Sequence, residues 1–353
     1  MAKIKLSDFD WERSHSLDDV CKATMERQDF ILGQSVRDFE KDFAQYCQAE
    51  HAVAVANCTD ALRLALQTLG VGPGTNVVTV GLTWLSTYEV IANLGADIRL
   101  VDVDDYLTID PTDALLSVDS NTRAIIGVDL FGQSCDWDKL QSEVPTISDA
   151  AQATGARYHN RQVGSIADIT CFSFYPTKNL GCLGDGGAIT TANTEYADAI
   201  RKLRNHGQSS KFNVDYVGWN SRLDTIQADI LRAKLPHLDS WNERRRSISD
   251  YYDQSFKNLF ELVPVRPNSH HVRHQYVVMT EQADALQQEL AKFDIESRRY
   301  YQALAYQQQP YGVETYLPNT ERYSQLNLAI PTHQFLTDNQ VSLIASIVKR
   351  VLE

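Results

Sequence analysis

The sequence predicts an α/β protein: a large domain with a mostly parallel seven-stranded sheet flanked by helices, followed by a smaller C-terminal α+β domain. Two observations support this prediction. Seven strand-like runs alternate with helical patterns up to Thr191, an order that is typical of parallel sheets. From Asp224 onward the chain is charged and helical over a long stretch, and only short β-like runs follow.

Taken in order, residues 16–50 show an irregular apolar stripe at helical spacing, and we expect them to be helical. Short runs rich in apolar and β-branched residues follow, each of a length typical of strands. Between the first three of these runs lie two helical patterns, at residues 59–69 and 86–94. The seven expected strands are residues 52–56, 76–80, 98–103, 123–130, 146–149, 169–175 and 188–191.

The smaller domain is expected to begin within a long helix. Residues 224–258 have a helical pattern, with Pro236 as the expected break, because proline has no backbone N–H and its ring clashes with the preceding helical turn. A β-like run at 275–279 and helical patterns near 281–293 and 337–351 follow. We place the boundary near residue 240, which gives a large domain of residues 1–240 and a small domain of residues 241–353.

Composition excludes several classes of protein. The 353 residues are 43% hydrophobic and carry a formal net charge of −13. An acidic surface repels nucleic acid and anionic lipid, so we expect neither as a partner. The chain has no apolar run of the roughly 20 residues that a membrane span needs, and its N-terminus lacks the apolar core of a signal peptide. The six cysteines include no CxxC pair, which argues against a zinc site or a disulfide framework and favours the cytoplasm.

The most informative segment is CFSFYPTKNLGCLGDGGA at residues 171–188, where a strand runs into a loop that contains Ser173, Lys178 and several glycines. A lysine with apolar neighbours can have its pKa lowered by desolvation. Its neutral amine can then form a Schiff base with an aldehyde. The alternative is that Lys178 is an ordinary solvated loop lysine, as most lysines are.

Three further positions add to this picture, and each has an ordinary alternative. Asp149 ends a strand, where a carboxylate can hold the pyridine nitrogen of a pyridoxal ring protonated; it could equally cap a helix. The turn at Thr59 and Asp60 leads into a helix whose N-terminus suits a phosphate, although both residue types also serve as plain N-caps. Trp84 could stack on a flat ring, or it could be a core tryptophan.

The combination resembles the DegT/DnrJ-type sugar aminotransferases, which are pyridoxal-phosphate (PLP) enzymes of the aspartate aminotransferase fold, PLP-dependent transferase fold type I. The resemblance covers almost the whole chain, and the order and spacing of its pieces make it specific. The matching segments are residues 31–40, 57–62, 71–78, 146–156, 171–188, 217–228 and 326–331.

The resemblance implies a role for each matching position. Lys178 would bind PLP as a Schiff base and move the proton during the reaction, and Asp149 would pair with the pyridine nitrogen. Trp84 and Gln152 would lie against the ring. The cofactor phosphate would be held by Thr59, Asp60 and Ser173, and also by Asn220 of a neighbouring subunit, so that the active sites need a homodimer.

The chain also departs from the family pattern. Cys58 stands where the family usually has glycine, so we expect a less tight turn there. Tyr300, Tyr301 and Gln302 replace a His-Tyr-Pro stretch that contacts substrate in the family, and Asp129 replaces a usual histidine. These departures leave the identity of the sugar open.

The resemblance implies transfer of an amino group from L-glutamate to the keto group of a nucleotide-linked sugar. The segment from Arg204 to Arg222 is most similar to members that aminate carbon 3 of a 3-keto-6-deoxyhexose or a 3-keto uronic acid, with carbon 4 as the alternative. Tyr175, His206, Arg222 and Tyr301 are the candidate substrate contacts. The cluster of Arg201, Lys202, Arg204 and Lys211 could bind a diphosphate, but such clusters are usually just solvated.

Rival interpretations remain. A relative that removes a hydroxyl from the sugar would carry histidine in place of Lys178. A regulatory relative without catalysis is the other rival, and the intact Lys178, Asp149 and Ser173 argue against it. The histidines at 270, 271 and 274 could suggest a metal, but a surface position is more common for such a group. We expect no metal site and give His274 a structural or substrate-edge role.

Overall fold

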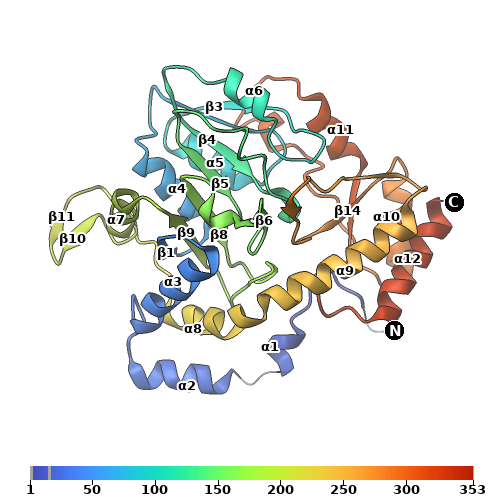
Figure 1. The fold of residues 1–353 in the computed structure, drawn as a ribbon, viewed down its shortest axis with the longest axis horizontal. Coiled ribbons are helices and arrows are strands. Elements are labelled where there is room, and N and C mark those ends of the chain that lie inside the picture. The colour runs from blue at the N-terminus through green and yellow to red at the C-terminus, as the bar shows by residue number, and fades with distance from the viewer. Residues whose placement is uncertain (1–2, 15–16, 353) are drawn as a thin grey trace.

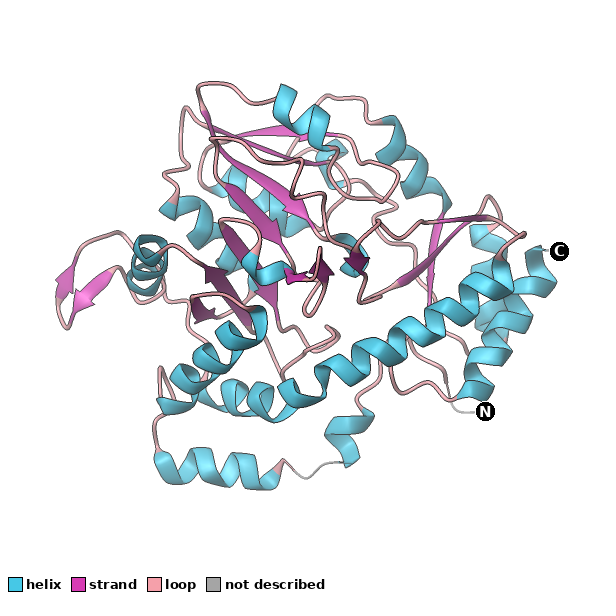
Figure 2. Ribbon diagram, viewed as in Figure 1, coloured by secondary structure: helices cyan, strands magenta, loops and turns pink. Residues whose placement is uncertain are grey.

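The computed structural model describes residues 3–14 and 17–352, and it has the predicted α/β architecture (Figures 1 and 2). The central sheet has seven strands in the order β1-β9-β8-β5-β4-β2-β3. Strand β9 pairs antiparallel with both β1 and β8, and the other strand pairs of this sheet are parallel. The prediction of a mostly parallel sheet is therefore confirmed. Its strands are β1 (His51–Val55), β2 (Asn76–Val80), β3 (Asp97–Val101), β4 (Thr122–Val128), β5 (Thr146–Asp149), β8 (Ile169–Ser173) and β9 (Gly187–Thr191).

Helices cover both faces of the sheet because successive strand residues point to opposite sides. On one face Val53 and Val55 pack with helix residues such as Leu62, and on the other Ala52 and Ala54 pack with Phe39 and Phe43. The first face is covered by α4 (Cys58–Thr68), α5 (Leu85–Asn93) and α7 (Thr194–Leu203), and the second by α3 (Gln34–Cys47) and α8 (Thr225–Lys234).

The prediction of one helical stretch at residues 16–50 is wrong in part. The structure has α2 (Asp18–Arg27) and α3, separated by a turn in which Gln28 and Leu32 adopt positive φ angles of 55° and 51°. The turn is stabilised by the Asp29 carboxylate, which accepts a hydrogen bond from the backbone N–H of Gln34 at 2.7 Å. Periodicity alone does not show this turn. The sequence analysis also missed α1 (Asp10–Ser14), α6 (Pro111–Leu116), α7, α11 (Pro318–Leu326) and the hairpin of β10 (Gln208–Ser210) and β11 (Asn213–Val214).

Pro236 interrupts the long helical stretch as predicted. Helix α8 ends at Lys234, a 3-10 turn follows at Leu235–His237, and α9 begins at Leu238 and runs to Phe256. The later residues of α9, among them Tyr252 and Phe256, pack in a second core with Val278 and Ile344. This core also contains the antiparallel β14 (Tyr276–Met279) and β15 (Asn327–Ile330) with α10 (Ala283–Lys292) and α12 (Asp338–Leu352), and β12 (Glu261–Leu262) pairs with β14.

The two ends of the chain lie close to each other on the second core (Figure 1). Ile4 forms a bridge with Ile295 and packs with the residues of this core. A smaller three-stranded sheet joins β13 (Ser269–His270) to β6 (Arg157–Tyr158), which pairs with β7 (Arg161–Gln162). The domain boundary near residue 240 stays a prediction.

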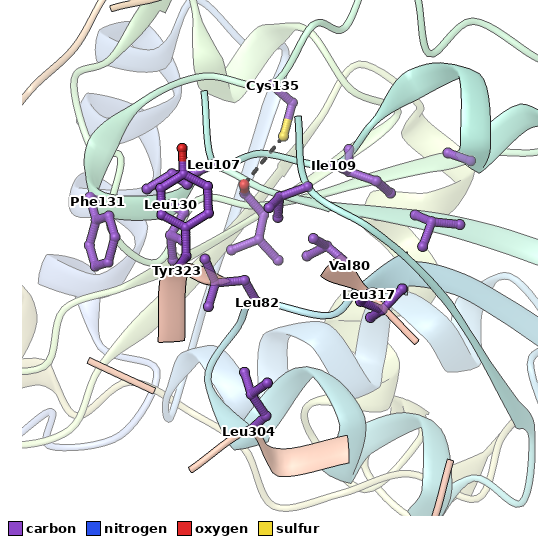
Figure 3. Packing of buried hydrophobic residues seen from close by; sticks show 14 of the residues in the cluster. Val80, Leu82, Leu107, Ile109, Leu130, Phe131, Cys135, Leu304, Leu317 and Tyr323 are labelled. Carbon is purple, nitrogen blue, oxygen red and sulfur yellow. Dashed lines mark hydrogen bonds between the residues drawn. The ribbon is translucent and has the colours of Figure 1, made fainter. Parts of the chain in front are cut away.

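The sheet positions the site through the carboxyl ends of β4, β5 and β8, which run parallel and end at one edge. In open α/β sheets this edge is where ligands bind. Beside it lies a large apolar core, in which Leu82, Leu130 and Phe131 are close to one another (Figure 3). Among the described residues, no helix has the length and apolar character that crossing a bilayer requires.

Candidate active site

A cavity of about 460 Å³ opens where β4, β5 and β8 end. The last residues of these three strands, Val128, Asp149 and Ser173, all line it. Eight of the predicted site residues belong to the lining: Thr59, Trp84, Asp149, Gln152, Ser173, Tyr175, Lys178 and Tyr301.

Lys178 lies in the loop that follows β8. Its backbone N–H donates to the carbonyl of Tyr175 at 2.9 Å. Gly181 allows the loop to turn back, since a Cβ there would lie 2.4 Å from the carbonyl oxygen of Pro176. Burial lowers the pKa of Lys178 below its ordinary value and outweighs the opposite effects of Cys58 and Asp149. The lowered pKa increases the neutral fraction of the amine, which is the form that attacks an aldehyde.

Asp149 is 6% exposed and faces the same cavity. Its carboxylate accepts hydrogen bonds from the Thr87 hydroxyl at 3.1 Å and from the backbone N–H of Ala151 at 3.2 Å. Burial raises the pKa of Asp149, while these two donors and the nearby Lys178 favour its charged form. No helix starts after Asp149, so it is not a helix cap. Its fixed carboxylate suits a cationic ring nitrogen.

The turn before α4 forms another wall of the cavity. Asn57 caps the helix, because its side-chain oxygen accepts the backbone N–H of Asp60 at 2.8 Å. The Thr59 hydroxyl is hydrogen-bonded to that of Ser86 at 2.8 Å, and both residues line the cavity. The N–H groups of a first helical turn suit a phosphate. Asp60 was expected to help hold the phosphate, but it does not line the cavity, and its carboxylate pairs with Arg63.

Gly187 of β9 makes this turn possible. A Cβ at position 187 would lie 2.5 Å from the carbonyl carbon of Asn57 and 2.9 Å from the backbone nitrogen of Cys58. The strand can therefore approach the turn only without a side chain. A glycine at position 187 thus has a physical reason that the sequence alone does not show.

We expect Gly187→Ala to displace the turn and to weaken binding of a phosphate-bearing cofactor by about 10-fold or more, on the scale of a 1–3 kcal/mol overpacking cost. Equilibrium titration of the apoprotein with PLP measures this loss. Gly72→Ala is the matched control, because the nearest atom to its new Cβ would be a carbonyl oxygen 3.9 Å away. Equal affinities of the two variants would contradict this role of Gly187.

Aromatic residues form the wall opposite the loop of Lys178. Gln152 links two of them, since its side chain accepts the backbone N–H of Phe131 at 2.8 Å and donates to the Tyr301 hydroxyl at 3.0 Å. The rings of Phe131 and Tyr301 are nearly parallel, with centroids 6.5 Å apart. Trp84 lies 6.3 Å from Tyr301 and is 58% exposed. Trp84 is thus not a core residue, and its ring is accessible for stacking.

Asp129 is fully buried behind this wall. Its carboxylate accepts the backbone N–H of Cys135 at 2.7 Å and the Ser148 hydroxyl at 2.6 Å, and burial raises its pKa to about 6. These bonds close the turn that carries Phe131, whose φ is 56°. Cys135 and Leu130 anchor the turn in the apolar core (Figure 3). Asp129 therefore supports the wall without lining the cavity.

Three predicted residues lie away from the cavity. His206 is exposed, and its backbone N–H donates to the carbonyl of Trp219 at 2.7 Å. Asn220, also exposed, bridges to Asn205, to which the Arg222 guanidinium donates at 3.0 Å. In the chain, the three residues flank the β10–β11 hairpin of residues 208–214. None of them belongs to the cavity of their own chain.

The structure also places two candidate clusters, the cationic cluster at residues 201–211 and the histidines at 270–274. Most of the cationic cluster is engaged within the chain: Arg201 pairs with an aspartate at 3.0 Å, Lys202 with another at 2.8 Å, and Arg204 with Glu40. These contacts do not favour the diphosphate interpretation. His271 and His274 are buried, so the expectation of a surface position is wrong for His271, while His274 was given a structural or substrate-edge role.

His274 lines the cavity, and its ring is 3.0 Å from the Asn179 side-chain oxygen. Burial holds its pKa well below the ordinary value. Its position agrees with the expected structural or substrate-edge role. Among the residues that the structure describes, no group of three or more His, Cys, Asp or Glu side chains is arranged to hold a metal ion.

Several residues that build the site were not predicted from the sequence, because no local pattern distinguishes them. Thr87 supports Asp149 from α5, and its hydroxyl is also 2.9 Å from that of Thr83. Phe131 and Arg298 reach the cavity from segments far apart in the chain. Only the fold brings such residues together.

Comparison with known proteins places these features in context. Residues 13–349 match the DegT/DnrJ/EryC1/StrS aminotransferase family. The chain is 35% identical over 336 residues to a dTDP-3-amino-3,4,6-trideoxy-α-D-glucose transaminase of Streptomyces venezuelae, covering 92% of this chain and 89% of that protein. It is 37% identical over 334 residues to a UDP-N-acetyl-3-dehydro-α-D-glucosamine 3-aminotransferase of Acidithiobacillus ferrooxidans, covering 92% and 90%.

The fold is similar to that of a solved structure, S. venezuelae DesV in complex with a ketimine intermediate. The two superpose with a TM-score of 0.95 at 33% identity, over 100% of this chain and 99% of the other. The similarity covers the whole chain and therefore includes the elements that line the cavity. The predicted PLP-dependent transferase fold is therefore confirmed.

Proposed function

Because this chain belongs to the DegT/DnrJ/EryC1/StrS aminotransferase family, we propose that it transfers an amino group from L-glutamate to carbon 3 of a nucleotide-linked 3-keto sugar. The family is PLP-dependent, and the chain is a PLP-dependent aminotransferase. One observation carries the choice of carbon 3. The two curated relatives described above match this chain over nine-tenths of its length, and both are named for an amino group at that carbon.

The residues of the cavity fit PLP. A half-buried lysine with a lowered pKa and a buried carboxylate line one cavity, and the hydroxyls of Thr59 and Ser86, from the first turns of α4 and α5, lie on the same cavity. When bound, PLP supplies an aldehyde that takes up the amino group and a ring that spreads the negative charge of the reacting carbon. Lys178 would hold the aldehyde, Asp149 the ring nitrogen, and Thr59, Ser86 and Ser173 the phosphate.

The chain's own residues would then perform the proton transfers. The Lys178 amine, once free, would take the proton from the carbon that bears the amino group and deliver it to the former aldehyde carbon on the other side of the nitrogen, as a positioned base and acid. Asp149 stabilises positive charge at the ring nitrogen, and Thr87 holds that carboxylate in place. Trp84 and the Gln152–Tyr301 pair line the cavity and would lie against a flat ring.

The acceptor could instead carry its keto group at carbon 4, and a regulatory relative without catalysis is a further alternative. The intact Lys178 and Asp149 on one cavity favour catalysis. The proposal is tested by incubating the holoenzyme with L-glutamate and UDP- or dTDP-linked 3-keto sugars, and then analysing the products by mass spectrometry and NMR. A 3-amino sugar together with 2-oxoglutarate is the expected outcome. Absence of any amino sugar from either acceptor would overturn the proposal.

We further propose a homodimer with shared active sites. The β10–β11 hairpin projects from the rest of the fold (Figures 1 and 2). Phe212 in its turn is 83% exposed, and Val217, three residues after β11, is 87% exposed. Exposed apolar side chains grouped in this way are typical of an interface. Asn220 lies six residues after β11 and three after Val217, so a partner subunit covering these residues would meet Asn220 as well. A cytoplasmic location also remains our proposal, and it suits the six free thiols.

Mixed dimers test the shared site. We expect Lys178→Ala and Asn220→Ala dimers to have low activity separately, and co-expressed subunits to recover about one quarter of wild-type activity, because half of the dimers are mixed and each has one intact site. The control combines Lys178→Ala with Asp149→Asn, two residues that line the cavity of the same chain, and it should recover nothing. Recovery in the control, or none in the test pair, would contradict the shared site.

A further inference from the structure

Arg298 lines the cavity but has no part in the mechanism described above. Its backbone is fixed by two hydrogen bonds with Ala329 of β15, at 3.1 and 2.8 Å. Its guanidinium lies 3.6 Å from the carboxylate of Glu296, and 60% of the side chain is exposed. Arg298 thus places a cation at the open side of the cavity.

Arg298 is one of the few charged side chains among the described residues that line the cavity. Among the described lining residues, the lysine and arginine side chains are Lys178 and Arg298, and the carboxylates are Asp149 and Asp185. Lys178 is half-buried, has a lowered pKa and is committed to the reaction. The whole chain carries a formal net charge of −13, so an anionic ligand needs a local cation to approach.

The Glu296 carboxylate is only a partial partner for Arg298. One of its oxygens accepts the backbone N–H of Leu6 at 3.2 Å, and the contact to the guanidinium is longer than an ordinary charge-assisted hydrogen bond. Arg299, the next residue, contrasts with this arrangement. Its guanidinium donates to Asp284 and to the carbonyl of Gln325, away from the cavity.

We propose that Arg298 binds the diphosphate of the nucleotide-linked sugar, an inference that rests on the proposed function. A sugar whose keto carbon reaches Lys178 extends its diphosphate toward the open side, because the sheet closes the other end of the cavity. A guanidinium suits phosphate oxygens, which it can bind through two parallel hydrogen bonds. Tyr300 and Tyr301, which follow Arg298 in the chain, line the same cavity.

Binding of UDP and dTDP to the holoenzyme tests this role without catalysis. By isothermal titration calorimetry we expect Arg298→Gln to bind the better of the two nucleotides about 10- to 100-fold more weakly than wild type. Arg298→Lys should be intermediate, because it keeps the charge but loses the planar fork. Arg322→Gln is the matched control, since this arginine is 49% exposed and pairs with Glu261 away from the cavity.

The half-reaction with L-glutamate separates the diphosphate from the donor carboxylate. We expect Arg298→Gln to take up the amino group from glutamate at the wild-type rate. A slowed glutamate step with unchanged nucleotide binding would overturn the proposal, as would wild-type nucleotide affinity in Arg298→Gln. If the wild-type holoenzyme itself bound neither nucleotide, the proposed substrate class would fail, and the inference on Arg298 with it.

Discussion

Replacement of Lys178 by alanine is expected to slow amino transfer from L-glutamate by about 1,000-fold or more, because the reaction loses both its cofactor-binding amine and its positioned base. The visible absorbance of the cofactor bound to the lysine should disappear as well. The fold should persist, since the loop is held by backbone contacts such as that between Lys178 and Tyr175. Stopped-flow absorbance with glutamate measures the rate, and circular dichroism checks the fold.

Lys292→Ala provides the control for this variant. Lys292 is 69% exposed in α10 and pairs with Glu289, so we expect wild-type rates and absorbance. A small primary amine added to Lys178→Ala should restore part of the rate, because the shortened side chain leaves room for it in the cavity. A Lys178→Ala protein that retained both colour and rate would show that another amine does the chemistry.

The Asp149→Asn variant is expected to slow the glutamate step by about 100-fold or more, on the scale of losing one electrostatic partner at a reacting centre. Asparagine has the same shape but no charge, and the Thr87 hydroxyl can still donate to its oxygen. The loss should therefore fall on the rate rather than on the melting temperature. Single-turnover kinetics and thermal unfolding measure the two effects separately.

Asp185→Asn is the matched control, because Asp185 is an exposed carboxylate on the same cavity. It should retain most of the wild-type rate. A similar loss in both variants would mean that the net charge of the cavity matters and the position of Asp149 does not. An unimpaired Asp149→Asn would remove Asp149 from the mechanism.

Much of the fold could be predicted because local patterns agree with the final structure. Strands at 76–80 and 146–149 were predicted at the bounds that the structure has, since buried strands form short apolar runs between turn residues. The break at Pro236 follows from the chemistry of proline. The turn between α2 and α3 was missed, because hydrophobic periodicity records neither the positive φ angles of Gln28 and Leu32 nor the Asp29 carboxylate that stabilises the turn.

The candidate site was predictable where its residues share one segment. Lys178 and Ser173 lie in a single strand–loop segment, and Asp149 ends a neighbouring strand, so a parallel sheet brings all three to one edge. Phe131 and Arg298 have no such signal, because they reach the cavity from segments far apart in the chain, and neither has Thr87, which acts on Asp149 from α5. His206, Arg222 and Asn220 lie outside the cavity of their own chain, and only a partner subunit would give them a place in an active site.

The half-reaction with the acceptor sugar tests the central claim most directly. The holoenzyme is converted to its aminated form with L-glutamate, freed of glutamate, and offered 3-keto and 4-keto nucleotide sugars in separate experiments. Our account predicts that the original absorbance returns with a 3-keto sugar and not with a 4-keto sugar. Return with the 4-keto sugar alone, or with neither, would contradict amination at carbon 3.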